Sequence, residues 1–161
     1  MSQDAHAAEF IALDANQRDH LFGCLCEFSR IAFGVTSAAT IFRVATVPSA
    51  MPALLAEMHT LAERHAFDCA ILIRALGVVY LALLPPHDPK IYPQLLNFSR
   101  ELTTLCTTSG AAPMIELCPL EIKNALSIWP PVGSEHEIAQ RLKRVFDPQG
   151  ILSPGRFRGG I

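Results

Sequence analysis

Arg43, Arg74 and Glu116 are the only charged residues within the stretches of this chain that have the composition of β-strands. A charged side chain in a strand needs a partner or a ligand, because charged groups are rarely buried alone. An arginine can hold a carboxylate with two parallel hydrogen bonds from its planar guanidinium. Arg43 and Arg74 are therefore candidate substrate-binding residues for a small carboxylic acid.

A structural interpretation competes with binding for Arg43. If its strand and the strand of Glu116 are antiparallel neighbours, the two side chains can pair across the sheet. Both interpretations stay open at this point. Arg74 is the stronger candidate, because it lies beside Gly77, where a backbone can approach a ligand closely. Tyr80 is a third candidate, but it shares a face with Arg74 only for some hairpin lengths, and a half-buried strand aromatic is its alternative role.

The histidines and cysteines form no recognised catalytic or metal-binding pattern. His59 and His65 are six residues apart on one helical stretch and point in different directions, and Cys24 and Cys26 diverge in the same way. No dinucleotide-binding glycine motif, phosphate-binding loop or nucleophile elbow is present. We therefore expect no metal site and no catalytic residue, and the pattern is typical of an incomplete enzyme.

Composition limits the remaining classes of function. The 161 residues are 50% hydrophobic and 17% charged, with a net charge of −2. This apolar excess suggests a missing partner surface, and the absence of a basic cluster outside the C-terminal helix argues against nucleic acid. No apolar run is long enough to cross a bilayer. No secretory signal is visible at the first residues, and five cysteines make an odd number, so we expect a soluble, cytoplasmic protein with reduced thiols.

These candidate residues must be positioned by a regular alternation of elements. The predicted order is strand 40–47, a helix from Ser49 to His65, strands 69–74 and 78–84, a helix from Asp88 to Gly110, and strand 113–118. This βαββαβ order predicts an α+β fold with a ferredoxin-like antiparallel sheet, whose helices cover one face. Flanking helices or another domain must cover the second face.

Helical segments flank this core on both sides. Residues 1–37 form an N-terminal helical segment, residues 38–118 the ferredoxin-like core, and residues 119–161 the C-terminal helices with a docking tail. A capping box at Ser134 and Glu137 is expected to begin the last helix, which ends at Phe146. Turns at Asp147–Gly150 and Ser153–Gly155 then fix a tail that would otherwise fray, so this tail is expected to dock against something.

The tail resembles the terminal signature of FAD-linked oxidases of the vanillyl-alcohol oxidase type. The signature is carried by Leu142–Lys143, Phe146–Asp147–Pro148, Gly150–Ile151–Leu152 and Pro154–Gly155–Arg156–Phe157. Ser153 stands where this family usually has asparagine, and the final Gly-Gly-Ile is most similar to the FAD-binding subunits of the glycolate oxidase type. The likeness extends over about residues 38–161 and includes Val47-Pro48-Ser49 and Gly77–Tyr80.

The resemblance implies the cap, or substrate, domain of an FAD-dependent oxidoreductase acting on 2-hydroxy acids of the glycolate type. FAD is then held mainly by an FAD-binding domain that these residues do not include, and the chain is inactive alone. Arg156 and Phe157 are the expected contacts on the flavin side, and the implied partners are that domain and the other polypeptides of the oxidase. A further expected partner is a second copy of the chain, bound through an exposed apolar face.

A free-standing function is the alternative. On this interpretation the chain is a ferredoxin-like module that binds a small carboxylate or dimerises.

Overall fold

The computed structural model describes residues 11–74, 76–130 and 132–161. The elements are α1 (Ala15–Cys26), α2 (Phe28–Val35), β1 (Thr40–Ala45), α3 (Met51–Arg64), β2 (Cys69–Arg74), β3 (Val78–Leu83), α4 (Tyr92–Thr108), β4 (Ala112–Leu117), α5 (Leu120–Ala125) and α6 (Glu135–Phe146), with short 3-10 helices at Pro48–Ala50, Pro89–Ile91 and Arg158–Gly160.

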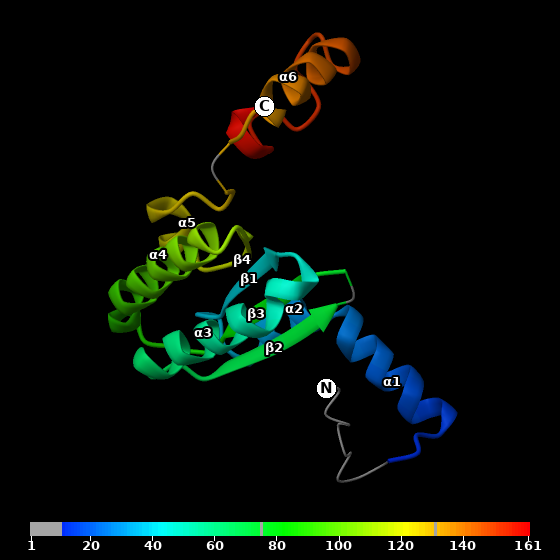
Figure 1. Cartoon of the computed structure of the whole chain (residues 1–161), viewed down its shortest axis with the longest axis vertical. Helices are drawn as coiled ribbons and strands as arrows, with labels where there is room; N and C mark the ends of the chain where they lie inside the picture. The colour runs from blue at the N-terminus through cyan, green and yellow to red at the C-terminus, as the bar shows by residue number, and fades with distance from the viewer. Residues whose placement is uncertain (1–10, 75, 131) are drawn as a thin grey trace.

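The four strands form one antiparallel sheet in the order β2-β3-β1-β4 (Figure 1). The first strand thus lies between the third and the fourth, as the βαββαβ succession requires. The predicted α+β class and ferredoxin-like arrangement are confirmed. The proposed division at residues 37 and 118 stays a prediction.

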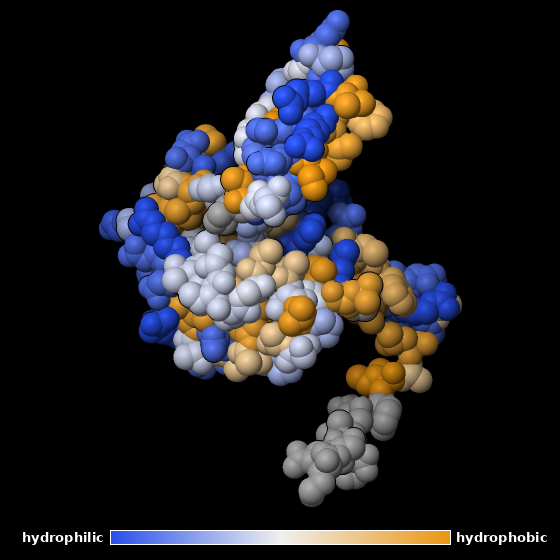
Figure 2. All heavy atoms as spheres, turned by 45° about the horizontal axis from the view of Figure 1, so that its top comes forward, coloured by the Kyte–Doolittle hydropathy of each residue, from blue (hydrophilic) through white to orange (hydrophobic). Residues whose placement is uncertain are grey.

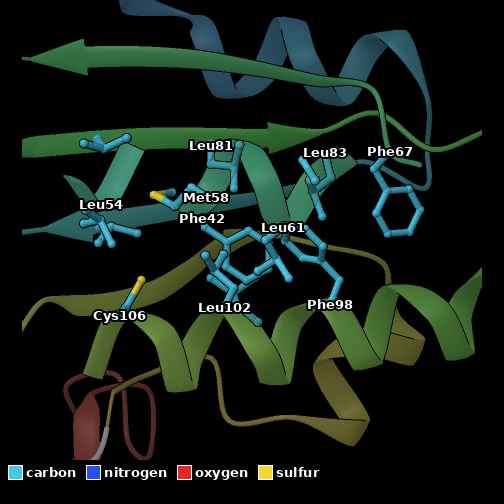
Figure 3. Close-up of a cluster of buried hydrophobic side chains, with 14 of the residues drawn as sticks. Phe42, Leu54, Met58, Leu61, Phe67, Leu81, Leu83, Phe98, Leu102 and Cys106 are labelled. Atoms are coloured by element: carbon cyan, nitrogen blue, oxygen red, sulfur yellow. The ribbon is translucent and has the colours of Figure 1, made fainter. Parts of the chain in front are cut away.

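Helices α3 and α4 cover one face of the sheet and enclose the main core. Their apolar residues recur three and four positions apart, so each helix turns one stripe toward the strands. In Figure 3, Phe98 and Leu102 of α4 point toward Phe42 of β1 and Leu81 of β3. All four side chains are at most 1% exposed.

Among the described residues, helix α2 covers part of the second face. Ala32 of α2 is buried against Ile41 and Ala82, and the Phe28 ring meets the Tyr80 ring edge-on at 6.3 Å between centroids. Helix α1 has no buried residue and projects away from the body (Figure 1). Of the two covers that the sequence allowed for this face, flanking helices or another domain, helix α2 therefore supplies part. A homodimer through this face stays a prediction, with less apolar surface available to it.

Helix starts only partly follow the sequence signals. The helix expected from Asp88 does begin there: Asp88 caps the 3-10 helix Pro89–Ile91 that leads into α4, because its carboxylate accepts a hydrogen bond from the Lys90 amide. Ser49 does not cap α3, since it lies inside the 3-10 helix that precedes it. Ser134 makes no side-chain capping bond, so the predicted capping box of α6 is wrong. A capping box that the sequence analysis missed joins Asp14 and Gln17 at the start of α1.

Helix α6 and the tail form a unit that stands apart from the sheet in Figure 1. The segment that leads to this unit lies along β4, where the Ile115 amide donates to the Ile128 carbonyl at 2.9 Å. None of the described helices combines the length and the apolar character that crossing a bilayer requires.

Candidate functional site

Arg74 and Tyr80 lie together on the face of the sheet that α2 partly covers. Arg74 ends β2 opposite Val78, and Tyr80 lies two residues further along β3, so both side chains point to the same face. The Arg74 guanidinium carbon is 4.9 Å from the Tyr80 ring centroid, which is a cation–π distance. Its Nη2 also donates to the Leu25 carbonyl at 3.4 Å. The length of the turn between β2 and β3, which the sequence left undetermined, therefore places Arg74 and Tyr80 on the same face of the sheet.

A hollow of about 510 Å³ lies beside this pair. Its lining comes from α2 and its N-cap, the end of α1, and three strands: Cys26, Glu27, Ser29, Arg30, Arg74, Tyr80, Glu116 and Leu117. Arg30 is paired with Glu27 at 3.1 Å between Nε and Oε2. Arg74 makes no ion pair with a described carboxylate. The arrangement therefore presents Arg74, backed by the Tyr80 ring, as the cation able to hold a small carboxylate.

Arg43 lies on the same face but outside this hollow. In the sheet it is opposite Tyr80 on β3 and opposite Met114 on β4, and its side chain is exposed. It forms no ion pair with Glu116, which lines the hollow instead. The structural alternative for Arg43 is thus not realised, and its substrate-binding role stays a prediction.

Sequence reasoning missed the contribution of Glu27 and Arg30. Both belong to the helical segment before the core, which the sequence analysis interpreted only as cover. Their spacing of three residues is the signal for a helix-surface ion pair. Nothing in the local pattern, however, shows that α2 lies across the sheet beside Arg74.

The tail is organised around the carboxylate of Asp147, which is only 6% exposed. Its two oxygens accept from the amides of Ile151 and Leu152, each at 2.9 Å. Lys143, one turn earlier on α6, contacts the same carboxylate at 2.6 Å and also donates to the Leu152 carbonyl at 2.6 Å. Asp147 therefore folds the turn back onto the helix, and Lys143 anchors it.

The hydrogen bond from Lys143, joined by the bonds from the Leu152 and Ile151 amides, holds the pKa of Asp147 below its ordinary value of 3.8. A depressed pKa means that the folded tail favours the charged form. The contribution to tail stability is thus complete above about pH 3.8 and is lost as pH falls through the lower, folded-state pKa.

We expect the amide signals of Ile151 and Leu152 to lose their folded NMR shifts and exchange protection during an acid titration below that value. Asp147→Asn, which removes the ion pair with Lys143, is expected to lose this protection already at neutral pH. Unchanged protection in the variant would show that the carboxylate does not hold the tail.

Arg156 and Phe157 border a second hollow, of about 510 Å³, between α6 and the tail. Its lining is mostly apolar and includes Ala139, Leu142, Phe146, Leu152 and Ile161. The Phe157 ring packs against Trp129, with centroids 5.6 Å apart, and remains 54% exposed. The tail therefore presents an apolar surface beside the Arg156 cation.

These residues do not fit a complete FAD molecule. A dinucleotide cofactor needs several backbone amides around its pyrophosphate, whereas this hollow is apolar and its second cation, Lys143, is already engaged by Asp147. The surface can cover one side of a group that another domain holds.

Two of the thiols lie fully or partly buried outside both hollows. Burial raises the pKa of the Cys106 thiol to about 12, and burial also raises the pKa of Cys118. No three His, Cys, Asp or Glu side chains within the described ranges gather closely enough to hold a metal ion.

A nucleophile–base contact between two distant segments of the chain was not expected from the sequence. Ser37 Oγ and His87 Nδ1 lie 2.7 Å apart. The two residues are fifty positions apart in the sequence, so no local motif predicts their contact. Both are exposed and neither lines either hollow, and the neighbouring Asp88 carboxylate binds the Lys90 amide rather than the imidazole. This pair therefore lacks the third group that would orient it for catalysis.

Comparison with known protein families gives a match to the C-terminal part of the chain. Residues 133–157 match the family described as FAD linked oxidases, C-terminal domain. These residues comprise α6, the Asp147 turn and Phe157. No curated protein and no solved structure matches the chain. The match supports a relationship to the C-terminal domain of FAD-linked oxidases and falls on the unit that carries the apolar tail surface.

Proposed function

We propose that this chain is the cap, or substrate, domain of an FAD-dependent oxidoreductase of the glycolate type, which oxidises 2-hydroxy acids. The observation that carries the proposal is the tail held by Asp147, because the matched family segment coincides with it. An FAD-binding domain supplies the pyrophosphate site, and the cap closes over the flavin from the opposite side. The other polypeptides of the oxidase complete the assembly.

The tail is the proposed docking surface for the FAD-binding domain. Figure 2 shows apolar atoms gathered along one side of the α6 unit and polar atoms along the other. The exposed apolar residues include Leu142, Val145, Phe146, Leu152 and Phe157, each more than half exposed. A surface of this kind on an isolated domain is typical of an interface. Arg156 and Phe157 are the proposed contacts on the flavin side.

The sheet face is the proposed substrate side. Arg74 would hold the carboxylate of a 2-hydroxy acid, with Tyr80 supporting its guanidinium and Arg43 on the neighbouring strand as a further cation. Their common face and the hollow of about 510 Å³ support this assignment. The atoms that react with flavin would come from the substrate and the cofactor, and this chain would bind and orient the acid.

The test is assembly with a separately purified FAD-binding domain of a glycolate oxidase. We expect the isolated chain to be colourless, and the mixture to form a complex with a flavin spectrum altered by the cap. Phe157→Ala should weaken the complex at least about tenfold, because buried aromatic anchors dominate interface energies. Phe22→Ala, an equally large truncation at the exposed helix α1, should leave the complex unchanged.

Two results would contradict the proposal. A purified chain that already carries FAD would show that the cofactor site lies within it. Equal affinities for the Phe157 and Phe22 variants, with the tail amides still protected in both, would show that the tail is not the docking surface.

The alternative is a free-standing ferredoxin-like module that binds a small carboxylate, and the open hollow at Arg74 favours it. Calorimetric binding of glycolate to the chain alone, lost in Arg74→Gln, together with no assembly with the FAD-binding domain, would select this alternative.

A further inference from the structure

The two outer edges of the sheet differ in their hydrogen-bonding partners. The outer edge of β4 is joined by the chain itself, through the bond from the Ile115 amide to the Ile128 carbonyl. The outer edge of β2 faces no described strand. Exposed edges are usually protected by lysine, proline or a bulge. β2 has none of these, and its single charge, Arg74, stands at its last position.

The free edge of β2 presents a complete set of hydrogen-bonding groups. The Asp68 carbonyl accepts from the Leu84 amide at 2.8 Å, so even-numbered residues of this strand direct their backbone groups toward β3. By alternation, the N–H and C=O groups of Cys69, Ile71 and Ile73 point outward. Only another strand can satisfy such a row in regular order.

The side chains at this edge are incompletely covered. Ile71 and Ile73 are opposite Leu81 and Val79, which are fully buried in the main core. Nevertheless, Ile71 is 39% exposed and Ile73 is 49% exposed. Extending the sheet beyond β2 would bury both side chains, because they lie on the face that α3 and α4 cover.

The charges identify the strand that fits this edge. Asp68 and Arg74 lie three residues before and three residues after Ile71, and both are exposed. Neither makes an ion pair with another described residue. An antiparallel copy of β2 centred on Ile71 places Asp68 of each copy opposite Arg74 of the other. These are non-hydrogen-bonded pairs, in which facing side chains are closest.

We propose that two copies of this chain associate through β2. The two strands pair antiparallel with Ile71 facing Ile71 on the two-fold axis, and two ion pairs between Asp68 and Arg74 fix the register. In the single chain the Arg74 guanidinium lies over the Tyr80 ring and donates to the Leu25 carbonyl, so its remaining N–H donors must turn toward the β2 edge to bind Asp68 of the second copy. A small carboxylate bound at Arg74 would compete with this ion pair. The proposal concerns the strand edge and does not rest on the proposed oxidase role.

Sedimentation velocity of the full chain over a range of concentrations tests this association. We expect the mass to rise from 17.6 kDa toward twice that value. Asp68→Arg should raise the dissociation constant at least about tenfold, because it places like charges opposite each other twice. The swap Asp68→Arg with Arg74→Asp should restore the wild-type constant to within about threefold.

Glu57→Arg provides the matched control, since Glu57 is an exposed acid on α3 and the charge change is the same. Circular dichroism confirms that each variant is folded. A wild-type chain that remains monomeric would overturn the proposal, and so would a double variant that stays as weak as Asp68→Arg. Equal effects of Asp68→Arg and Glu57→Arg would assign the change to net charge and would also reject it.

A cysteine cross-link tests the register independently. Hydrogen-bonded antiparallel pairs have Cα atoms about 5.5 Å apart, which a disulfide can span. Ile71→Cys should therefore form a dimer joined at position 71 under mild oxidation, as identified by mass spectrometry of the linked peptide. Leu76→Cys, at a position 92% exposed but off the edge, should not. Faster linkage at position 76 than at position 71 would contradict the proposed register.

Discussion

Replacing Phe98 by alanine is expected to lower the free energy of unfolding by about 3–5 kcal/mol, the range for removing a buried phenylalanine. Phe98 is fully buried between α4 and the sheet. Its ring centroid lies 6.2 Å from that of Phe42, 5.7 Å from Phe67 and 5.4 Å from His65. The substitution removes apolar contacts and leaves a cavity that both layers of the core border.

Urea denaturation followed by circular dichroism measures this loss. The control is Phe22→Ala, which removes the same atoms from a side chain that is 60% exposed on α1. Its effect should stay within about 0.5 kcal/mol, as for surface substitutions in general. Similar losses for the two variants would mean that α1 is packed in solution and that the core is less dependent on Phe98 than its burial indicates.

The core can be predicted from the sequence for a simple physical reason. Phe98 and Leu102 are four residues apart on one helical stripe, and the strands alternate between the core and the opposite face, so local periodicity already indicates which side chains face inward. The order of the elements then leaves few ways to pair the strands. Periodicity and order together therefore predicted the ferredoxin-like sheet.

The candidate site was only half predictable, because it depends on contacts between distant segments. Arg74 and Tyr80 stood out as polar residues in apolar strands, yet their common face followed from the turn between them. Glu27 and Arg30 reach the same hollow through the packing of α2 across β1, β3 and β4, which no local pattern specifies. The capping box expected at Ser134 and Glu137 failed for a different reason: Ser134 itself has helical backbone angles (φ −60°, ψ −24°), whereas a capping residue has an extended backbone.

Because the turn between β2 and β3 sets the position of Tyr80, Gly77→Ala in this turn is expected to cause the second large loss of stability. Gly77 has a φ of +85°, and a Cβ built there would lie 1.9 Å from the Thr46 carbonyl oxygen. The approach is fixed, because the Thr46 amide donates to the Gly77 carbonyl at 2.8 Å. The methyl group therefore forces the hairpin away from the end of β1, in addition to the strain of a positive φ, which alone costs about 1–2 kcal/mol.

Gly110→Ala separates these two costs. Gly110 has a φ of +71° with open space around the position of a Cβ, so alanine there meets only the backbone strain. We expect Gly77→Ala to lose at least about 2 kcal/mol more than Gly110→Ala in urea denaturation, since a backbone clash cannot be relieved by a side-chain rotation. The NMR shifts of the Tyr80 ring should change only in Gly77→Ala, because the hairpin aligns this ring with Arg74. Equal losses of stability and an unchanged Tyr80 ring would show that the Gly77 turn does not position Tyr80 beside Arg74. The geometry of Arg74 would then have to come from α2 and the Leu25 carbonyl instead.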